Sequence, residues 1–151
     1  MLFKLSLQLS IVPQAWREAN VAPLHKKGSR EKLENYRPVS LTSIVGKVLE
    51  SIIKDNIVTH LDRHNLIDSS QHGFAKGKSC LTNLLDFFEV VTKELDAGSD
   101  VDFIYLDFSL AFDKVPYETL FKKLQSHRIS GSILNWIKNW LSERRQRVCI
   151  D

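Results

Sequence analysis

Asp107 is the residue whose type and setting most directly suggest chemistry. It lies in the apolar run V-D-F-I-Y-L-D-F, residues 101–108, whose β-branched, aromatic and aliphatic side chains are typical of a buried central strand. A carboxylate buried at the end of such a strand is costly unless a metal ion or another partner compensates its charge. Enzymes that transfer phosphoryl or nucleotidyl groups place acids there to hold Mg²⁺. An aspartate that caps the turn after the strand is the simpler explanation, and the strand alone favours it.

Helices and short extended segments must position this strand. Apolar residues at helical spacing predict helices over residues 44–66 and 81–95, with Ser43 as N-cap of the former, then a helix opened by Pro116. Before these helices we expect a short helix with Leu2, Leu5 and Leu9 that is ended by Pro13, then an extended segment at Val21–Leu24. A turn and polar loop over 28–35 and an extended N-Y-R-P-V-S-L segment follow, and a loop over 68–79 separates the two longer helices. Toward the end of the chain we expect a helix carrying Ile133, Trp136 and Trp140 and a strand that begins near residue 145.

Composition indicates one ordinary domain. The 151 residues are 43% hydrophobic and 26% charged, which allows a core and gives no sign of disorder. The net charge of +3 leans weakly toward nucleic acid. Cys80 and Cys149 lack metal-ligand spacing, so we expect reduced, buried thiols in a cytosolic or nuclear protein. No stretch is apolar enough to span a bilayer, and Ser6, Gln8 and Ser10 interrupt the only signal-like run, so we expect neither membrane association nor secretion.

Five sequence blocks match, in order, blocks that are characteristic of one enzyme family. F-I-Y-L-D-F-S-L-A-F-D-K-V-P-Y, residues 103–117, matches the first catalytic motif of its palm, and N-Y-R-P-V-S-L, residues 35–41, matches a motif of its fingers. P-L-H-K-K-G at 23–28, Q-H-G-F-A-K-G-K-S at 71–79 and P-Q-A-W-R-E-A-N-V at 13–21 match further blocks of the fingers and their extension. Together they resemble the reverse transcriptases of non-LTR (LINE-type) retrotransposons, most of all the jockey-type elements.

The resemblance implies roles at the catalytic motif. Asp107 matches the metal-binding catalytic aspartate, and the backbone carbonyl of Phe108 would be a second metal ligand. Phe112 matches the bulky residue under the incoming sugar, which selects deoxynucleotides by excluding a 2′-hydroxyl. An ordinary core aromatic is the alternative for Phe112. Asp113 also lies in the motif, where a structural role at the connection between strand and helix is expected.

The resemblance also implies a nucleotide site and a template site. Arg37 matches the arginine that binds the triphosphate, and its fork of donors suits phosphate. Either Lys26 or Lys27 matches the lysine on the same triphosphate, Lys26 being slightly favoured by its distance from Arg37. Solvated loop residues are the alternative for all three, and a turn cap is the alternative for Gln71. The residues of the block that lies along the template and the primer–template duplex are Gln71, Gly73, Phe74 and Lys76.

Two other sets of polar residues remain. Arg144, Arg145 and Arg147 would either contact a phosphate backbone or protect an exposed strand edge by charge, and the second explanation is favoured. The histidines show no metal-ligand spacing and are assigned no role; they are residues 25, 60, 64, 72 and 127.

The mechanism that the resemblance implies needs more carboxylates than Asp107. Two Mg²⁺ ions activate the primer 3′-hydroxyl and neutralise the triphosphate. The family supplies further acids as an adjacent pair in a later hairpin, but this sequence contains no two adjacent acidic residues and no Gly-Pro-Gln-Gly-Ser-like block. We therefore expect a chain that is truncated before the second catalytic motif, begins within the family's fingers region and is inactive alone.

These observations predict an α+β fold, with helix-rich fingers and a partial palm of a right-hand polymerase. Fingers are expected over residues 1–75 and the partial palm over 76–151, with an incomplete antiparallel sheet. The run at 101–108 would then lack its usual neighbours, which predicts poor solubility in isolation.

The expected function is that of a piece of an RNA-directed DNA polymerase. Its partners would be an RNA template, a DNA primer and deoxynucleoside triphosphates. A non-enzymatic RNA-binding remnant, acting through Lys26, Lys27, Arg37 and Lys76, is the alternative, and salt-dependent RNA binding without chemistry would favour it. A receiver-like phosphotransfer domain is set aside because such folds alternate strands and helices regularly, whereas one strong strand stands here among several helices.

Overall fold

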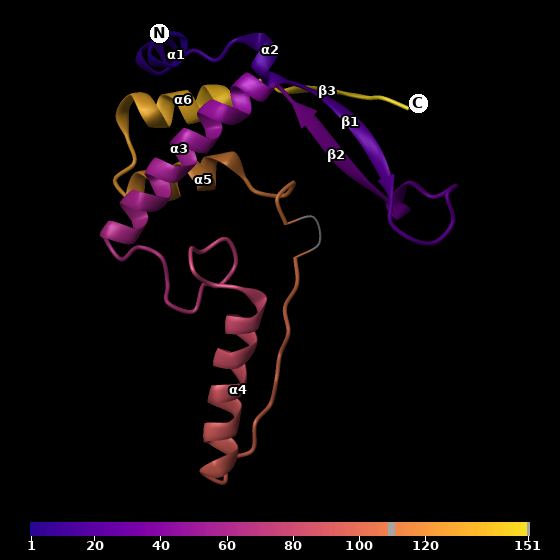
Figure 1. Ribbon diagram of the computed structural model, residues 1–151, viewed down its shortest axis with the longest axis vertical. Helices are drawn as coiled ribbons and strands as arrows, with labels where there is room; N and C mark the ends of the chain where they lie inside the picture. The colour runs from indigo at the N-terminus through magenta and orange to yellow at the C-terminus, as the bar shows by residue number, and fades with distance from the viewer. Residues whose placement is uncertain (109–110, 151) are drawn as a thin grey trace. The chain divides into compact units, whose positions relative to one another are not determined.

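A computed structural model describes residues 1–108 and 111–150 (Figure 1). The chain forms two compact units. The first unit consists of Met1–His60 together with the chain from Val115 onward, and the second consists of Leu61–Lys114. The division differs from the expected fingers and palm at residues 1–75 and 76–151, and that assignment stays a prediction.

The first unit carries most of the regular structure. Its elements are α1 (Leu2–Leu9), α2 (Gln14–Arg17), β1 (Glu18–His25), a 3-10 turn at Leu33–Asn35, β2 (Tyr36–Thr42), α3 (Ile44–Arg63, whose last three residues belong to the second unit), α5 (Tyr117–Ser126), α6 (Gly131–Leu141) and β3 (Arg145–Val148). The predicted helices and the predicted final strand are therefore confirmed. Ser43 also begins α3 as expected, because its Oγ accepts a hydrogen bond of 3.4 Å from the amide of Gly46.

The sheet of the first unit has three strands in the order β2-β1-β3. β1 and β2 form an antiparallel hairpin, and β3 pairs with β1 in parallel, so the sheet is mixed where an antiparallel one was expected. Ala19 and Val21 of β1 are buried, whereas Glu18 and Asn20 are exposed. Because side chains alternate along a strand, Ala19 and Val21 lie on one face of the sheet and Glu18 and Asn20 on the other. Burial on the first face is confined to β1, since every residue of β3 is exposed.

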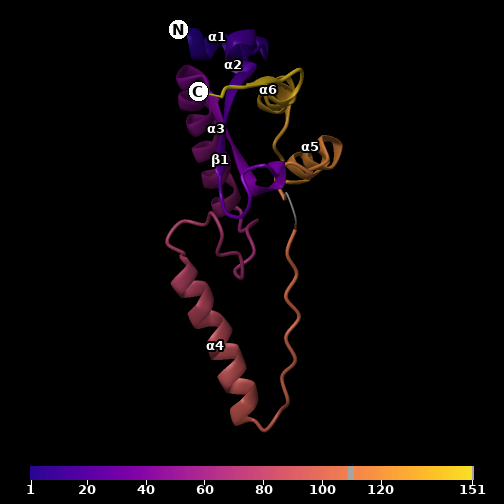
Figure 2. The same cartoon turned by 90° about the vertical axis from the view of Figure 1, so that its right-hand side faces the viewer.

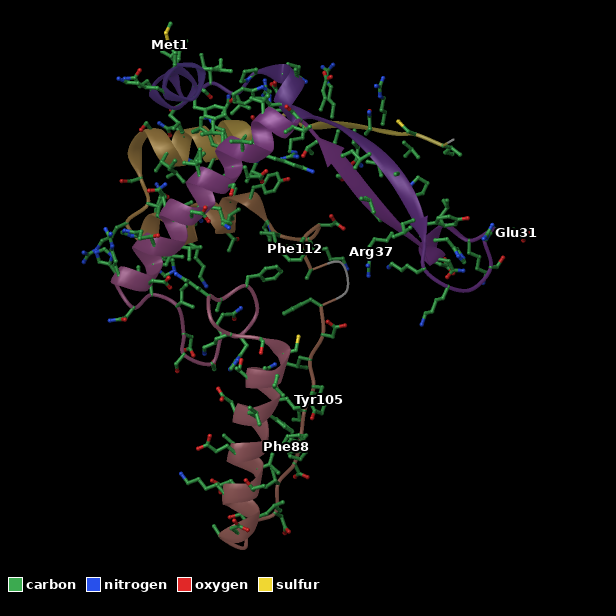
Figure 3. All side chains as sticks on the ribbon, in the orientation of Figure 1. Met1, Glu31, Arg37, Phe88, Tyr105 and Phe112 are labelled. Atoms are coloured by element: carbon green, nitrogen blue, oxygen red, sulfur yellow. The ribbon has the colours of Figure 1, made fainter. Side chains whose placement is uncertain are left out.

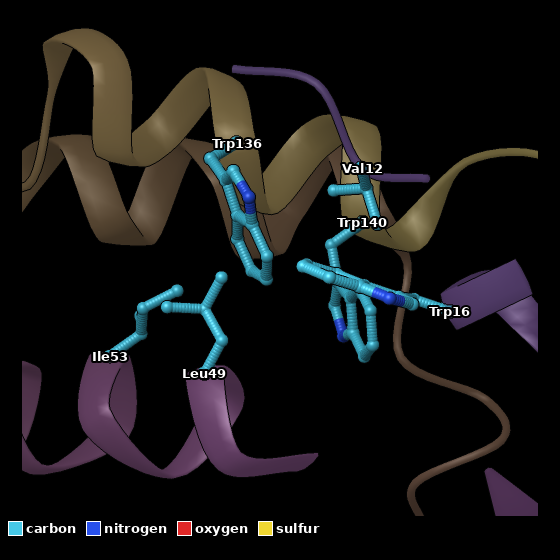
Figure 4. Packing of buried hydrophobic residues seen from close by; sticks show 6 residues of the cluster. All are labelled: Val12, Trp16, Leu49, Ile53, Trp136 and Trp140. Atoms are coloured by element: carbon cyan, nitrogen blue, oxygen red, sulfur yellow. The ribbon is translucent and has the colours of Figure 1, made fainter. Parts of the chain in front are cut away.

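The core of the first unit is built around three tryptophans (Figure 4). Trp136 and Trp140 of α6 stack with their ring centroids 5.3 Å apart. They pack against Leu49 and Ile53 of α3, while Val12 and Trp16 complete the cluster from the N-terminal segment. Stacked aromatic pairs contribute about 0.5–1.5 kcal/mol beyond the area that they bury. Gly46 lies where α3 approaches α6, and a Cβ there would lie 3.0 Å from the ring of Trp140, closer than an ordinary van der Waals contact.

Hydrogen bonds fasten the N-terminal segment to α6. The indole nitrogen of Trp136 donates to Ser6 Oγ at 2.9 Å, and Ser6 Oγ donates to the carbonyl of Ile11 at 2.6 Å. The amide of Val12 donates to Asn139 Oδ1 at 2.9 Å. The segment before β1 is therefore an integral part of the first unit.

The second unit contains α4 (Cys80–Asp96) and the extended segment that follows it (Figure 2). Ser79 caps α4 through a capping box with Thr82, whose amide donates to Ser79 Oγ at 3.2 Å. The extended segment runs beside α4 in both views, and Phe87 contacts the rings of Phe103 and Tyr105 at centroid distances of 5.1 and 6.4 Å. Figure 3 shows Phe88 and Tyr105 on these two segments.

The prediction of a buried central strand at residues 101–108 is wrong for this structure. The segment is extended but pairs with no strand among the described residues, and Ile104, Leu106 and Phe108 are more than four-fifths exposed. A strand is stabilised by neighbours that satisfy its backbone groups and cover its side chains, and the described part of the chain supplies no such neighbour.

The expectation of buried thiols is also wrong, because Cys80 and Cys149 are both free and exposed. Cys80 lies in the first turn of α4, of which no residue is buried, and Cys149 directly follows the edge strand β3. Among the described residues, no helix combines the length and hydrophobicity that crossing a bilayer requires.

Candidate functional site

The β1–β2 hairpin positions the residues predicted to bind a triphosphate. Arg37 lies opposite Leu24 in the register of the two strands, and the amide of Lys26 donates to the carbonyl of Asn35 at 2.8 Å. Arg37, Lys26 and Lys27 are therefore brought together near the closed end of one hairpin, and all three are exposed. Figure 3 labels Arg37 on β2. The backbone does not discriminate between the two lysines.

Side-chain hydrogen bonds hold the hairpin loop in one conformation. Asn35 Nδ2 donates to the carbonyl of Ser29 at 2.7 Å, and the Tyr36 hydroxyl donates to the carbonyl of Arg30 at 2.9 Å. His25 Nε2 lies 3.1 Å from the carbonyl of Gly28, and since a carbonyl only accepts, the ring nitrogen is the donor. These ordering contacts were missed from the sequence, although Asn35 and Tyr36 belong to the N-Y-R-P block that signalled the site.

The hairpin end carries a positive charge that is open to an anion. Residues 26–37 include five basic and two acidic residues. The only ion pair within this stretch of the described chain joins Lys32 and Glu34 at 4.0 Å, and such exposed pairs contribute little. Among the described residues no carboxylate pairs with Arg37. The guanidinium group of Arg37, with its several N–H donors, together with the ammonium group of one or both lysines, is suited to bind a polyphosphate.

The predicted template residues lie in the loop between α3 and α4. Gln71 Nε2 donates to the carbonyl of Gly73 at 2.8 Å, so this side chain orders its own turn, as the turn-cap alternative expected. Phe74 has a φ of +59° and is almost fully exposed. Lys76 lines an open hollow of about 540 Å³ in this loop. The loop therefore presents an aromatic ring and a cation to solvent.

Asp68 and Ser70 stabilise the start of this loop. Asp68 Oδ1 accepts hydrogen bonds from the hydroxyl of Ser70 at 2.7 Å and from its amide at 2.9 Å. These two bonds, the hydroxyl first, hold the pKa of Asp68 below its ordinary value of 3.8. Lys78 Nζ donates to the carbonyl of Ser69, which adds a second local constraint.

His72 fastens the same loop to α4, a role that the sequence did not reveal. Its side chain is only 7% exposed, with Nε2 3.0 Å from Asp86 Oδ2 and Nδ1 3.1 Å from Thr82 Oγ1. Because Thr82 also belongs to the capping box of α4, the loop is tied to the start of the helix. The signal in the sequence was the position of His72 inside the Q-H-G-F block. Metal-ligand spacing could not reveal this role, because His72 binds a helix residue and not a metal.

Asp107 and Phe108 lie on the exposed extended segment, and Phe112 lies in the turn after it. The rings of Phe112 and Phe74 meet edge to face with centroids 6.0 Å apart, so the structure brings together one predicted nucleotide residue and one predicted template residue. Phe112 is 80% exposed and is therefore not the core aromatic that the alternative proposed. Asp113 is also exposed, and its expected structural role stays a prediction.

The described residues supply only part of a metal site. In residues 1–108 and 111–150, no three side chains of histidine, cysteine, aspartate or glutamate form a group that could hold one. Asp107 offers one carboxylate, and the expected backbone ligand at Phe108 adds a single neutral oxygen. Two Mg²⁺ ions require several oxygen ligands in a fixed arrangement.

Comparison with known proteins establishes the family. The sequence profile described as "Reverse transcriptase (RNA-dependent DNA polymerase)" matches residues 24–150, and the chain belongs to this family. It is similar to the RNA-directed DNA polymerase from mobile element jockey of Drosophila melanogaster, with 28% identity over the whole chain, and to the probable RNA-directed DNA polymerase from transposon BS of the same species, with 24% identity over 98% of the chain. In both cases it covers 16% of the relative's length.

A third relative is the retrovirus-related Pol polyprotein from type-1 retrotransposable element R2 of Popillia japonica, which is 24% identical over 87% of the chain. The chain covers 18% of that protein. The resemblance to non-LTR retrotransposon enzymes is thus confirmed. Enzymes of this family work with divalent metal ions on nucleic-acid templates.

Proposed function

We propose that this chain supplies the triphosphate-binding hairpin and the template-facing loop of an RNA-directed DNA polymerase from a non-LTR retrotransposon. The observation that carries the proposal is the β1–β2 hairpin, which holds Arg37 and Lys26 together, exposed, at one ordered end. Either Lys26 or Lys27 would neutralise the triphosphate beside Arg37. The loop with Gln71 and Phe74 would face an RNA template, and a DNA primer would be extended with deoxynucleoside triphosphates.

The remaining roles follow from the family. Asp107 and the carbonyl of Phe108 would ligate Mg²⁺, which supplies Lewis-acid activation when it is bound. Phe112 would lie under the sugar of the incoming nucleotide. Because this chain offers one carboxylate at that position and contains no adjacent acidic pair, we infer that it does not extend a primer by itself.

Triphosphate binding is the direct test of the hairpin. The purified chain is titrated with a deoxynucleoside triphosphate, and Arg37→Ala is compared with Arg30→Ala, a matched loss of charge in the loop of the same hairpin. Charge-assisted hydrogen bonds contribute about 1.5–3 kcal/mol, so Arg37→Ala should weaken binding at least about tenfold. Equal effects of both substitutions would contradict the assignment of Arg37.

Primer extension tests the inactivity of the chain. A primer annealed to an RNA template is incubated with the chain, Mg²⁺ and nucleotides, with Asp107→Ala as the control. We expect no extension, and extension that disappears in Asp107→Ala would refute the inference. Salt-dependent RNA binding without measurable triphosphate binding would favour the RNA-binding alternative.

A further inference from the structure

The outer face of the three-stranded sheet is open to solvent in the first unit. The opposite face carries the buried Ala19 and Val21, so the exposed Glu18, Asn20 and Leu24 of β1 define the outer face. Residues paired across a ladder place their side chains on the same face. The register of β2 and β3 therefore identifies every side chain that shares this face.

Arginines from two strands lie on the outer face. Arg37 of β2 is paired with Leu24, while Arg145 and Arg147 of β3 are paired with Glu18 and Asn20. A direct contact of Arg147 agrees with this register, because Arg147 Nε donates a hydrogen bond of 2.7 Å to Asn20 Oδ1.

Strand geometry sets the spacing of these groups. With a rise of about 3.3 Å per residue, the Cα atoms of Arg145 and Arg147 are about 6.6 Å apart. Four residue steps along β1, from Leu24 to Asn20, separate the row of Arg37 from the row of Arg147 by about 13 Å. That length corresponds to about four nucleotides of a stacked strand, at an axial rise of about 3.4 Å each.

The surface between the two basic ends is apolar. Val39 and Leu41 of β2 are exposed on the outer face, and Leu24 continues the same patch. At the β3 end an open hollow of about 440 Å³ is lined by Glu18, Asn20, Leu41, Thr42, Arg145 and Arg147.

The arginines of this face are free to bind an anion. Among the described residues no carboxylate lies within ion-pair distance of Arg37, Arg145 or Arg147. The hydrogen bond from Arg147 to Asn20 uses only its Nε and orients the two terminal nitrogens of the guanidinium. Within the paired strands, Glu18 is the one acidic residue on the face.

We propose that Arg145 and Arg147 bind the phosphates of a single-stranded RNA template laid across this outer face, toward the triphosphate-binding Arg37 at its other end. The inference rests on the proposed function and adds a second binding surface to it. Guanidinium groups bind phosphate through paired hydrogen bonds, and an apolar middle accommodates unpaired bases, whereas the bases of a duplex are paired and stacked inside it. Protection of the β3 edge, which the sequence favoured, would not require both arginines to share the face of Arg37.

The test measures binding of a single-stranded RNA oligonucleotide to the full 151-residue chain over a range of salt concentrations. Each lost phosphate contact lowers the slope of log affinity against log salt by about 0.7 for single strands, so the double variant Arg145→Gln/Arg147→Gln should lower it by about 1.4. Arg144→Gln is the matched control, because the Arg144 guanidinium lies over the ring of Trp140 at 5.0 Å. It should leave the slope unchanged.

Two further variants separate binding from folding. Arg145→Lys/Arg147→Lys keeps both charges and should retain most of the slope. Glu18→Gln removes the acid on the face and should strengthen RNA binding, a gain that misfolding cannot produce. Equal losses in Arg144→Gln and in the double variant, or no gain in Glu18→Gln, would overturn the proposal, as would equally strong and equally sensitive binding of a duplex.

The same samples distinguish this inference from the proposed function. Triphosphate binding should depend on Arg37 and not on Arg145 and Arg147. If Arg37→Ala weakens triphosphate binding but substitution of Arg145 and Arg147 leaves RNA binding unchanged, the assignment of the hairpin is retained and the outer-face site is refuted. If triphosphate binding is absent while the β3 arginines control RNA binding, the hairpin assignment fails and the RNA surface remains.

Discussion

Replacing Ser6 with alanine tests the hydrogen bonds that fasten the N-terminal segment to α6. Ser6 Oγ accepts from the indole of Trp136, which is 1% exposed, and donates to the carbonyl of Ile11. Without the hydroxyl, the indole N–H has no partner and no access to water. A buried polar group left unsatisfied costs about 1–3 kcal/mol, and we expect Ser6→Ala to reduce the free energy of unfolding of the first unit by that amount.

The assay is urea unfolding followed by tryptophan fluorescence. All three tryptophans of the sequence, Trp16, Trp136 and Trp140, lie in the core of the first unit, so the signal reports this unit alone. Ser126→Ala is the matched control, because the Ser126 hydroxyl makes an exposed bond to the carbonyl of Lys123 at 2.8 Å. An exposed substitution of this kind should change stability by no more than about 0.5 kcal/mol.

Equal destabilisation by Ser6→Ala and Ser126→Ala would refute the reasoning. It would mean that water reaches the indole in the folded state, or that the N-terminal segment does not pack on α6 in solution. An unchanged slope of free energy against urea is also expected, because the hydroxyl contributes little to the surface exposed on unfolding.

Two further predictions concern the loops of the candidate site. Gly28 has a φ of +81°, and a Cβ there would lie 2.7 Å from Asn35 Nδ2. Gly28→Ala should therefore distort the hairpin loop and weaken triphosphate binding several-fold. Triphosphate binding by Ser29→Ala is measured as the control. Asp68 has a lower pKa in the folded state than in the unfolded state, so its ionised carboxylate stabilises the fold. This stabilisation should be complete at a pH well above 3.8, and it should be lost as the pH falls through the pKa of Asp68 in the folded state. Ser70→Ala should raise the pKa of Asp68 toward 3.8 in an NMR titration, and an unchanged value would contradict the cause given.

The sequence predicted the local elements well because their signals are local. Ser79 and Thr82 form a capping box directly before an amphipathic stretch, and α4 begins there. Pro38 follows Arg37 in an extended segment, and the structure places both in β2. The family was also recognisable, since several motifs occur in one order.

Pairings between distant residues were not predictable from such signals. Nothing local indicates that β3 joins β1 in parallel, or that Ser6 meets Trp136 across 130 positions. His72 was assigned no role, because only the packing of its loop on α4 brings it to Asp86. The run at 101–108 has the composition of a buried strand, but burial requires neighbouring strands, and composition does not supply them.

The sequence by itself therefore determined the family, the helices and the residue types at the candidate site. Helix caps, turn residues and amphipathic spacing act over a few positions, so they are readable along the chain. Tertiary structure alone decided which side chains share a surface. Arg37, Arg145 and Arg147 lie on one sheet face because the ladders of β1 align two strands that are about a hundred residues apart in the sequence, and backbone pairing of that kind depends on the whole fold.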